Sequence, residues 1–455
     1  MVDLRRGDCH WEVMASLSRR TVLSGAISLA LTTALPAQTL RLYGVNAYYL
    51  LVESYRKVQQ HPQRPLKDII QTYLVQDLGL QTLRRQSRIN AVRFWAFNDY
   101  PVSAPGVPDG TFDGAMWLAP NQPVELVFRI LEALVESLGE LEFFLIPVLG
   151  NYWLSYGGIL RYLEWAGAIP PGTWLNAFVT LKDQDKYLQY GADFYLNPRV
   201  EQLFQQHTGE VLRLLATHPN VIAIDILNEP RGKGIYAQAN RPVKPGVFMQ
   251  DVVADWLQRQ AVFIQRHMPR SVWVASGEEG WLNRTPSLPL TYLRADPQFY
   301  EGIDLALNMT RPALTLGTIH MYTHPAVELR KTSLAGLPFT DRRGWDFLLR
   351  SDRPPTLSAC QQLGDEWLRS RALAMNRKPW YVGELGWCRP RSAVDKRPLP
   401  SQALQHERIQ LYRHWSELAF ALGAKGVFLW LLDGLQHRDE FYGMTAAQIQ
   451  AIFPR

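Results

Sequence analysis

The sequence has few cysteines, no block of like charge and no long apolar segment, and each of these absences excludes a class of protein. Only 3 of its 455 residues are cysteine, so it is not a disulfide scaffold. The net charge is +6, and the basic residues are not clustered into a stretch that would bind nucleic acid, so we expect no nucleic-acid partner. No CxxC or HExxH pattern marks a metal site, and we expect neither a metal nor a cofactor.

Aromatic residues, by contrast, are abundant, with 15 Trp, 19 Tyr and 18 Phe. Core packing accounts for many of them, because 47% hydrophobic residues can fill a sizeable core. Such counts also suit a cleft that stacks flat rings. The length suits one large barrel domain or two ordinary domains.

The first 37 residues are predicted to be an export signal and leader, with either Met1 or Met14 as the start. Ser18-Arg19-Arg20 and Leu23, before an uncharged run that ends near Ala37, resemble a twin-arginine signal. The apolar run Val22–Leu35 has 14 residues, fewer than the ~20 of a spanning helix. We therefore expect a cleaved signal, no stable membrane span in the mature chain, and a periplasmic or extracellular monomer. A retained anchor or lipid attachment stays open.

From residue 38 to 455, short apolar runs alternate with longer amphipathic ones. The predicted strands are Arg41–Tyr48, Ile89–Phe97, Phe143–Gly150, Val221–Asn228, Val272–Ser276, Leu316–Met321, Pro379–Glu384 and Gly426–Leu431. The predicted helices are Lys67–Arg85, Val124–Leu138, Pro198–Ala216, Val252–His267, Gln361–Met375 and Gln402–Leu422. This α/β alternation predicts a single (β/α)8 TIM barrel with long loops on its catalytic face. A doubly wound sheet would want a GxGxxG turn after a strand, and none appears.

Two connections are longer than a barrel needs, from residue 151 to about 197 and from 322 to about 378. Both leave from predicted carboxyl ends of strands, so we expect them to overhang the catalytic face. The first is rich in aromatic residues, which suits subsites for sugar rings but also suits packing beneath a long loop.

One strand ends in a carboxylate. Six of the seven residues from Val221 to Leu227 are apolar, which indicates a strand buried on both faces. Pro230 stops it, so Asn228 and Glu229 lie at its carboxyl end, where barrels place catalytic groups. Taken alone, the three residues could equally be a polar turn at a strand exit.

A second strand ends in the same way. Trp380 to Gly383 is a short run closed by Glu384, and the carboxyl ends of all barrel strands meet on one rim. Glu229 and Glu384 can therefore face each other across the barrel. Paired carboxylates are the minimum for glycoside cleavage, because one protonates the departing oxygen and the other attacks carbon or activates water. Each glutamate alone would be structural more often than catalytic.

Other strand ends carry polar or flat side chains. Arg93 would hold a carboxylate ionised if it points inward, and would be a surface arginine if it points outward. His320 and Tyr322 share one face of their strand and could orient Glu384, although a histidine on an apolar strand is usually a core residue. Trp430 could form the floor of a sugar site, and Asn228 could bind a sugar 2-hydroxyl.

Together these motifs resemble glycoside hydrolase family 5, the cellulase-like clan of retaining barrels, and within it the endo-β-1,4-mannanase branch. The resemblance is carried by Gly44–Leu50, Arg93–Asp99, Asn151–Trp153, Tyr156–Gly158, Asn228–Arg231, Glu279–Trp281, His320–Tyr322 and Glu384–Gly386. It implies hydrolysis of a polysaccharide or oligosaccharide substrate, with Glu229 as acid/base and Glu384 as nucleophile. It places Arg93, Asn228, His320, Tyr322 and Trp430 around the −1 sugar, and further substrate contacts at Trp95, Asn151, Trp153 and Glu279.

Several alternatives stay open. The family usually has two adjacent asparagines where this chain reads Gly150-Asn151-Tyr152-Trp153, so the subsite roles of Asn151 and Trp153 are less secure. The long segment after Tyr322 would wall off one end of a cleft, which keeps an exo-β-mannosidase possible beside a β-glucanase. A non-catalytic carbohydrate-binding barrel is the alternative from another class.

A disulfide is a separate hypothesis. Cys360 should begin the helix after the sixth strand, and Cys388 lies four residues past Glu384, so both would sit on the catalytic rim. In an oxidising compartment they could pair and pin the two long loops. Free, partly buried thiols are the alternative.

Overall fold

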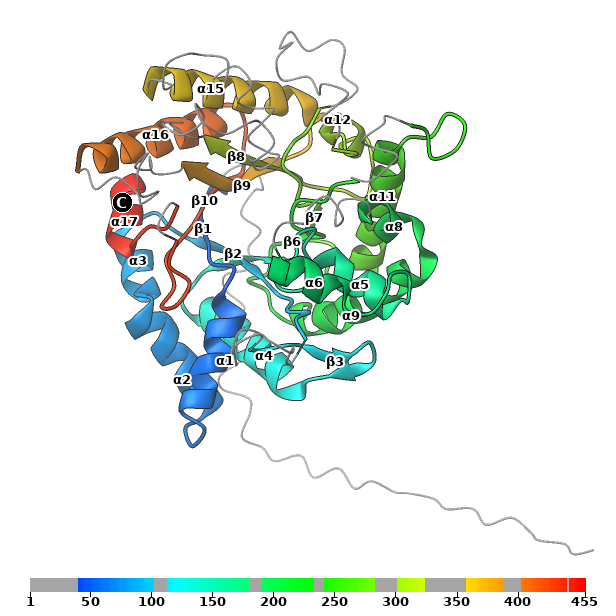
Figure 1. Cartoon of the computed structure of the whole chain (residues 1–455). Coiled ribbons are helices and arrows are strands. Elements are labelled where there is room, and N and C mark those ends of the chain that lie inside the picture. Colours follow the sequence, from blue (N-terminus) through cyan, green and yellow to red (C-terminus); the bar gives the residue numbers. More distant parts are fainter. Residues whose placement is uncertain are drawn as a thin grey trace, which may run out of the picture. The chain divides into compact units, whose positions relative to one another are not determined.

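Eight short apolar runs pair as parallel strands into the wall of a barrel, which confirms the predicted (β/α)8 fold (Figure 1). The structure is a computed structural model that describes residues 40–101, 113–180, 190–232, 241–282, 301–323, 357–387, 402–439 and 442–455. The strand order is β7-β6-β5-β2-β1-β10-β9-β8, and a parallel bridge from Ala275 to Leu316 joins its two ends. The strands are β1 (Leu42–Asn46), β2 (Ala91–Trp95), β5 (Phe144–Val148), β6 (Ala223–Asp225), β7 (Trp273–Ala275), β8 (Gly317–Thr323), β9 (Trp380–Trp387) and β10 (Gly426–Leu429).

Helices surround the strands, so the strands are buried on both faces and read as continuous apolar runs. The helices are α1 (Leu50–Gln60), α2 (Leu66–Thr72), the π-helical turn η2 (Tyr73–Asp77), α3 (Leu80–Gln86), α4 (Glu125–Glu140), α5 (Gly158–Trp165), α6 (Thr173–Thr180), α8 (Gly191–Leu196), α9 (Pro198–Leu215), α11 (Met249–His267), α12 (Leu305–Asn308), α15 (Leu357–Ala374), α16 (Gln402–Ala421) and α17 (Ala446–Ile452). A small hairpin, β3 (Trp117–Ala119) with β4 (Gln122–Pro123), precedes α4.

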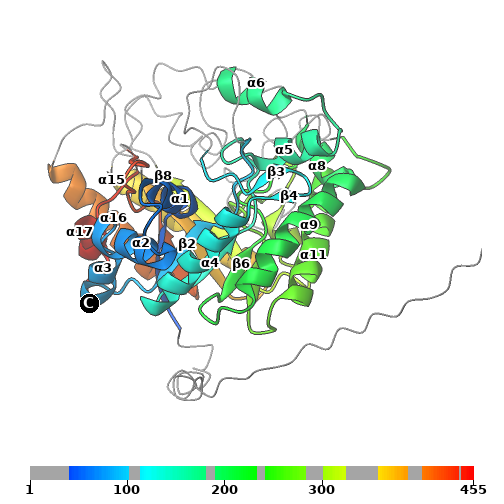
Figure 2. The same cartoon turned by 90° about the horizontal axis from the view of Figure 1, so that it is seen from below.

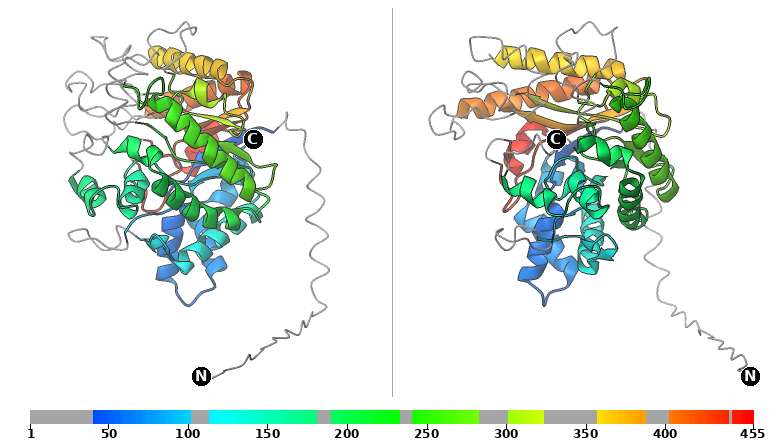
Figure 3. Two further views of the ribbon diagram at one scale, coloured as in Figure 1. Left: turned by 90° about the vertical axis from the view of Figure 1, so that its right-hand side faces the viewer. Right: turned by 45° about the vertical axis from the view of Figure 1, so that its right-hand side comes forward.

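The helices form a ring in which each packs on the next. From below, α4, α9 and α11 follow one another along one side (Figure 2). On the other side α15 (yellow) and α16 (orange) lie along each other beside β8 and β9, and α17 and α3 continue the ring (Figure 3). Buried leucine, isoleucine, valine and aromatic side chains between this ring and the strands make up the main hydrophobic core.

The helix predicted over Lys67–Arg85 is wrong as a single element. It breaks into α2, η2 and α3 because Gly79 has φ 67°, a left-handed conformation that ends one helix and starts another. The predicted long connection from residue 151 also has more structure than expected, since it contains α5, α6 and α8. Most other boundaries agree within about three residues.

Strand β9 carries one extra residue, and this irregularity positions Glu384. Opposite β8, Ile319 pairs with Val382 but His320 pairs with Glu384, so Gly383 has no partner of its own. Tyr381 points into the barrel, where its hydroxyl donates to Asp225. Strict alternation would turn residue 384 outward, because successive side chains point to opposite faces. The bulge at Gly383 restores Glu384 to the inner face.

Several predictions fall on residues outside this description. Residues 42 to 455 form one compact unit by contacts. The predicted signal, residues 1 to 37, lies outside the described residues. Within the described residues, none of the helices has the length and apolar character needed to cross a membrane. The proposed Cys360–Cys388 pair lies outside the described residues, since Cys388 is not among them and the Cys360 side chain is not described.

Candidate active site

Glu384 projects from β9 into the barrel mouth, and its two oxygens have separate donors. Arg93 Nη1 on β2 donates to Oε1 at 2.7 Å, and the Tyr322 hydroxyl on β8 donates to Oε2. Both Arg93 and Glu384 are buried, with 1% and 2% of their surface exposed. Arg93 therefore points inward, one of the two orientations that the sequence left open, and its positive charge favours the ionised form of the carboxylate beside it.

Arg93 is itself held by a polar layer inside the barrel. Its Nε donates to Asp225 Oδ2 at 2.7 Å, Nη1 to Asn46 Oδ1 at 3.0 Å, and Nη2 to Asn228 Oδ1 at 2.9 Å. The Tyr381 hydroxyl donates to the other oxygen of Asp225. The sequence reasoning missed Asn46, Asp225 and Tyr381. Asp225 had a signal, because it is the one charged residue in the apolar run from Val221 to Leu227.

Glu229 leaves the end of β6 in an unusual backbone conformation. Its φ is 52°, in the left-handed region that a side chain adopts only where its surroundings hold it there. The Glu229 N–H donates to the Gly277 carbonyl at 2.8 Å, and Gly277 itself has φ 79°. In the side chain, Oε2 accepts the Trp153 indole N–H at 2.6 Å and Oε1 lies 2.9 Å from His320 Nδ1.

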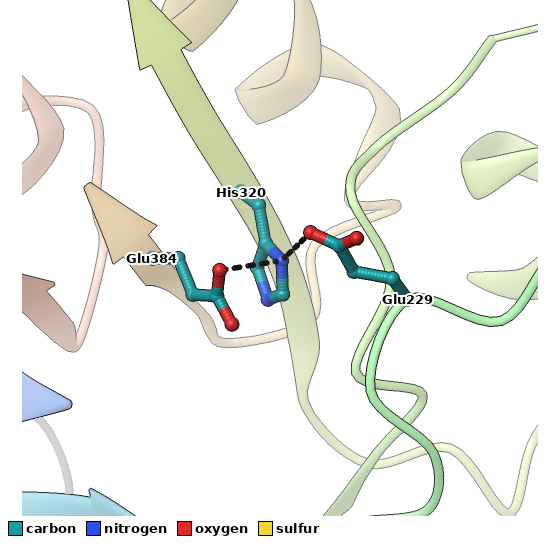
Figure 4. Close-up of side chains that lie close together, drawn as sticks. All are labelled: Glu229, His320 and Glu384. Atoms are coloured by element: carbon teal, nitrogen blue, oxygen red, sulfur yellow. Dashed lines mark hydrogen bonds and ion pairs between the residues drawn. The ribbon is translucent and has the colours of Figure 1, made fainter. Parts of the chain in front are cut away.

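The two carboxyl groups meet on one rim of the barrel with the ring of His320 between them (Figure 4). One oxygen of Glu229, one of Glu384 and a nitrogen of His320 all lie within 4.8 Å of one another. His320 was expected to orient Glu384, but its Nδ1 lies closer to Glu229, at 2.9 Å against 3.5 Å to Glu384 Oε2. Histidine and the two glutamates therefore form one cluster, with the histidine serving mainly Glu229.

Burial shapes the protonation of this cluster. It raises the pKa of Glu229, against the opposing effects of Arg231, the Trp153 N–H and Arg93. It also raises the pKa of Glu384, against His320, Arg93 and the Tyr322 hydroxyl, while the charge of Glu229 adds to the rise. Two carboxyls this close do not readily ionise together. Arg93 contacts Glu384 directly and therefore favours the negative charge on Glu384.

Burial also lowers the pKa of His320 to about 4, so its ring is neutral near pH 7. A neutral ring can share a hydrogen bond with Glu229 without adding a charge to the site. The pKa of Glu229 is therefore shaped by burial and by Arg231, Trp153 and Arg93, and its Oε1 lies beside the ring of His320.

An aromatic pocket lies near Tyr322, the hydroxyl donor to Glu384, because the rings of Tyr322 and the pocket residue Trp430 have centroids 6.3 Å apart. Trp430, just past β10, stacks on Tyr48 with ring centroids 5.5 Å apart and planes at 13°. The pocket has a volume of about 340 Å³, enough for a sugar-sized ligand. Its lining consists of Tyr48, Val52, Arg56, Trp95, Tyr100, Ser155, Tyr156, Trp430 and His437. Trp95 and Trp430, both expected at the site, thus line one pocket together with Tyr156, which belongs to the aromatic-rich connection from residue 151, and with Tyr48, which was not assigned to the site.

The remaining expected residues are placed less directly. Asn151 accepts from Asn228 Nδ2 at 3.1 Å and so supports the asparagine next to Glu229. Trp153 is half-buried and bonds Glu229 itself. Both carboxylate oxygens of Glu279, which is 2% exposed, accept from Arg231, and its pKa is raised to about 7, chiefly by burial. Glu279 is therefore engaged in a buried ion pair with Arg231.

Glu229, His320 and Glu384 also offer a nitrogen and two oxygens at a spacing that a metal ion could use. These donors are already engaged, since Glu384 accepts from Arg93 and Tyr322, and Glu229 accepts from Trp153. A guanidinium 2.7 Å from one of the oxygens would also repel a cation. The donor set does not fit a resident metal, and we assign none.

Comparisons with known proteins agree with this geometry. Residues 74–292 match the family model described as GH family 5 beta-mannosidase-like. Mannan endo-1,4-β-mannosidase 1 of Arabidopsis thaliana is 25% identical over 251 residues, covering 53% of this chain and 50% of that protein. A probable mannan endo-1,4-β-mannosidase A of Aspergillus clavatus is 27% identical over 179 residues, covering 38% of this chain and 37% of that protein. The chain thus matches about half, or less, of these relatives' length.

Solved structures show the same fold. The family 5 mannosidase of Rhizomucor miehei superposes with a TM-score of 0.57 at 16% identity, and the match covers 91% of each chain. The endo-1,4-β-D-mannanase of Thermotoga petrophila gives a TM-score of 0.55 at 19% identity, covering 88% of this chain and 92% of that one. The barrel and the two glutamates on its rim thus accompany a similarity to glycoside hydrolase family 5, β-mannosidase-like, over residues 74–292.

Proposed function

We propose that residues 38–455 form a catalytic domain that hydrolyses β-1,4-linked mannan-type polysaccharide with retention of configuration. The observation that carries this proposal is the approach of Glu229 and Glu384 within 4.8 Å of each other, oxygen to oxygen. Carboxyl groups about 5 Å apart leave no room for a water between the second carboxylate and the anomeric carbon, so that carboxylate attacks the sugar itself. The choice of mannan is supported by the relatives, whose names specify mannan endo-1,4-β-mannosidases.

In the first step the Glu384 carboxylate attacks the anomeric carbon and forms a glycosyl ester, while Glu229 gives its proton to the departing oxygen. The neutralised Glu384 then no longer opposes a charge on Glu229, so Glu229 becomes a base. In the second step Glu229 takes a proton from water, the hydroxide oxygen bonds to the anomeric carbon, and Glu384 leaves as a carboxylate. The proton taken from water stays on Glu229, so both residues regain their starting forms.

The surrounding side chains suit this sequence. Arg93 and Tyr322 hold the attacking carboxylate by one donor on each oxygen, which orients it before substrate arrives. Asn228 uses its oxygen for Arg93 and one amide hydrogen for Asn151, which leaves its second amide hydrogen for the sugar 2-hydroxyl. The pocket of Trp95 and Trp430 offers flat faces to the sugar beside the cleavage point.

The decisive test compares the wild type with Glu229→Gln and Glu384→Gln on mannan, glucomannan and β-glucans, with product anomers followed by NMR. We expect release of β-anomers from mannan by the wild type and a loss of at least ~10³-fold in each variant, with unchanged circular dichroism. Glu136→Gln, on the exposed face of α4, is the matched control and should keep full activity. Substantial activity in either catalytic variant, or an inverted product, would contradict the mechanism.

The same panel decides the substrate and the mode of cleavage. Preference for glucans would make the chain a β-glucanase, and release of mannose alone would make it an exo-β-mannosidase. Absence of hydrolysis, with binding retained, would favour the non-catalytic barrel.

Export through the predicted signal is a second part of the proposal. It is supported by Arg19 and Arg20 before the short apolar run ending at Leu35. Mass spectrometry of the mature chain should find a new N-terminus near Gln38. A chain that keeps residues 1 to 37 would be a retained anchor or an unprocessed protein.

A further inference from the structure

Trp153 is attached to the acid/base glutamate both through its side chain and through the backbone. Its indole Nε1 lies 2.6 Å from Glu229 Oε2. The residue before it, Tyr152, donates its N–H to the Asn228 carbonyl at 3.0 Å, and the Asn228 N–H donates to Gly150 at 2.8 Å. The segments that carry Trp153 and Glu229 are therefore paired in register. A shift of one would displace the other.

Arg231 lies against the face of that indole. The central carbon of its guanidinium is 4.6 Å from the Trp153 ring centroid, a distance at which a cation is attracted to the ring. Arg231 is fully buried. It follows Glu229 by only two residues, so the acid, the indole and the guanidinium form one compact unit.

Arg231 cannot move easily, because each part of it is bound. Nε donates to Glu279 Oε2 at 2.7 Å, Nη2 to the other oxygen of Glu279, and Nη1 to Glu301 Oε2 at 3.2 Å. Its backbone N–H donates to the Tyr195 hydroxyl at 3.1 Å. Glu279 is held in turn by the Trp281 indole at 3.0 Å. The guanidinium is thus a fixed surface on which the Trp153 ring rests.

We propose, resting on the function proposed above, that Trp153 and Arg231 are a positioning pair for the acid/base Glu229. Arg231 fixes the plane of the indole, and the indole N–H fixes Oε2 of the carboxyl. An indole N–H can only donate, so it favours Oε2 as the acceptor and leaves the transferable proton to Oε1, the oxygen that lies 2.9 Å from His320 Nδ1. The pair therefore fixes which carboxyl oxygen accepts and which carries the proton.

The charges around Glu229 allow the pair to act on protonation as well as on position. The indole N–H and the Arg231 charge both favour the ionised carboxylate, and two acids offset part of that arginine charge. The charged and titratable groups that face Glu229 are Arg93, Arg231, Glu279, Glu301, His320, Tyr322 and Glu384. Loss of the indole N–H should therefore raise the pKa of Glu229.

The test uses Trp153→Phe, which keeps a flat ring and removes the N–H. Two β-mannosides are compared by kcat/KM, which reports the first chemical step: a mannotetraose, whose leaving oxygen needs a proton, and a 2,4-dinitrophenyl mannoside, whose leaving group does not. We expect at least ~10-fold loss on mannotetraose, less than ~3-fold loss on the dinitrophenyl substrate, and an alkaline limb displaced to higher pH. Arg231→Lys should give the same pattern more weakly, because lysine keeps the charge without the planar contact.

Trp165→Phe is the matched control. Trp165 on α5 has the same kind of partner, with the Arg161 guanidinium 4.8 Å from its ring, but it lies outside the catalytic cluster. It should leave both kcat/KM values and the pH profile unchanged. Equal losses on the two substrates in Trp153→Phe, with an unmoved alkaline limb, would show a packing or stacking role and overturn the positioning pair.

The outcome separates this inference from the proposed function. If the wild type cleaves neither substrate, the proposed function fails. The pair is then judged by NMR titration of the Glu229 carboxyl in the wild type and in Trp153→Phe, where an unchanged midpoint would overturn it. If Trp153→Phe does not fold, Arg231→Lys carries the same comparison.

Discussion

Glu53 on α1 offers a prediction that the coordinates make quantitative. Its carboxylate is only 2% exposed, yet it has five donors. Oε1 accepts from the backbone N–H groups of Gln436 at 2.8 Å and His437 at 3.0 Å and from His437 Nδ1 at 2.8 Å. Oε2 accepts from the Tyr73 hydroxyl at 2.7 Å and from the Leu435 N–H at 3.0 Å. One acid near the start of the barrel thus holds the loop that follows its last strand.

These donors determine the ionisation of Glu53. Burial alone would raise its pKa, but the bonds from His437, Gln436, Tyr73 and Leu435 outweigh burial and lower the pKa from 4.5 to about 2. A difference of about 2.5 between the unfolded and folded pKa corresponds to about 3 kcal/mol of stability. Since the folded pKa is the lower one, this stability is present above about pH 4.5 and is lost as the pH falls toward about 2.

We therefore expect Glu53→Gln to lower the free energy of unfolding by about 3 kcal/mol at pH 7. An amide cannot accept on both ends, so its NH2 group would face donors. Urea unfolding at about pH 7 and about pH 3 measures the effect, and more than half of the difference should be gone at the lower pH. Glu136→Gln, at an exposed residue that pairs with Lys67 on the surface, should cost less than ~1 kcal/mol at both pH values. A Glu53→Gln deficit below ~1 kcal/mol, or one independent of pH, would refute the reasoning.

Two further predictions concern the carboxyls themselves. Gly277→Ala should lower kcat/KM by at least ~10-fold and the free energy of unfolding by about 1–3 kcal/mol. The reason is that a Cβ at residue 277 would lie 2.1 Å from the Leu227 carbonyl and displace the acceptor of the Glu229 N–H. Steady-state kinetics and denaturation measure the two effects, and near-normal activity would contradict the prediction. Tyr322→Phe should lower kcat by about 10–100-fold and move the acid limb of the kinetic pH profile to higher pH. The reason is that the Tyr322 hydroxyl favours the ionised form of Glu384. An acid limb that does not move would argue against this role of the hydroxyl.

The strands could be predicted from the sequence because parallel barrel strands are buried on both faces and read as short apolar runs. Gly383 could not, because a bulge adds one residue without changing the apolar pattern around it. The broken helix at Gly79 is similar, since a single glycine inside a helical pattern is often tolerated. Both the bulge and the helix break depend on the local backbone conformation, which the apolar pattern of the sequence does not reveal.

The part of the site that lies at the carboxyl ends of strands could be predicted from the sequence. Glu229, Glu384, Arg93 and Tyr322 were expected together and meet as expected. Arg231 was missed as a partner of Glu229, because its contacts run to Trp153, Glu279 and Glu301 on three other segments. Glu279 was assigned to substrate for the same reason, since nothing in its own segment shows the buried arginine that occupies it. Pairings across the rim depend on packing that one sequence does not reveal.

The bulge in β9 changes which residues of that strand face the inside of the barrel. Upstream of Gly383 the odd-numbered Tyr381 faces inward, and downstream of it the even-numbered Glu384 does. Whether the side chain of residue 384 reaches the site therefore depends on the number of residues that precede it in β9, as well as on its residue type. A barrel rebuilt with perfectly regular strands would keep every residue of the cluster and still turn its nucleophile toward the outer helices, so any transplant of this centre must copy the irregular spacing along with the side chains.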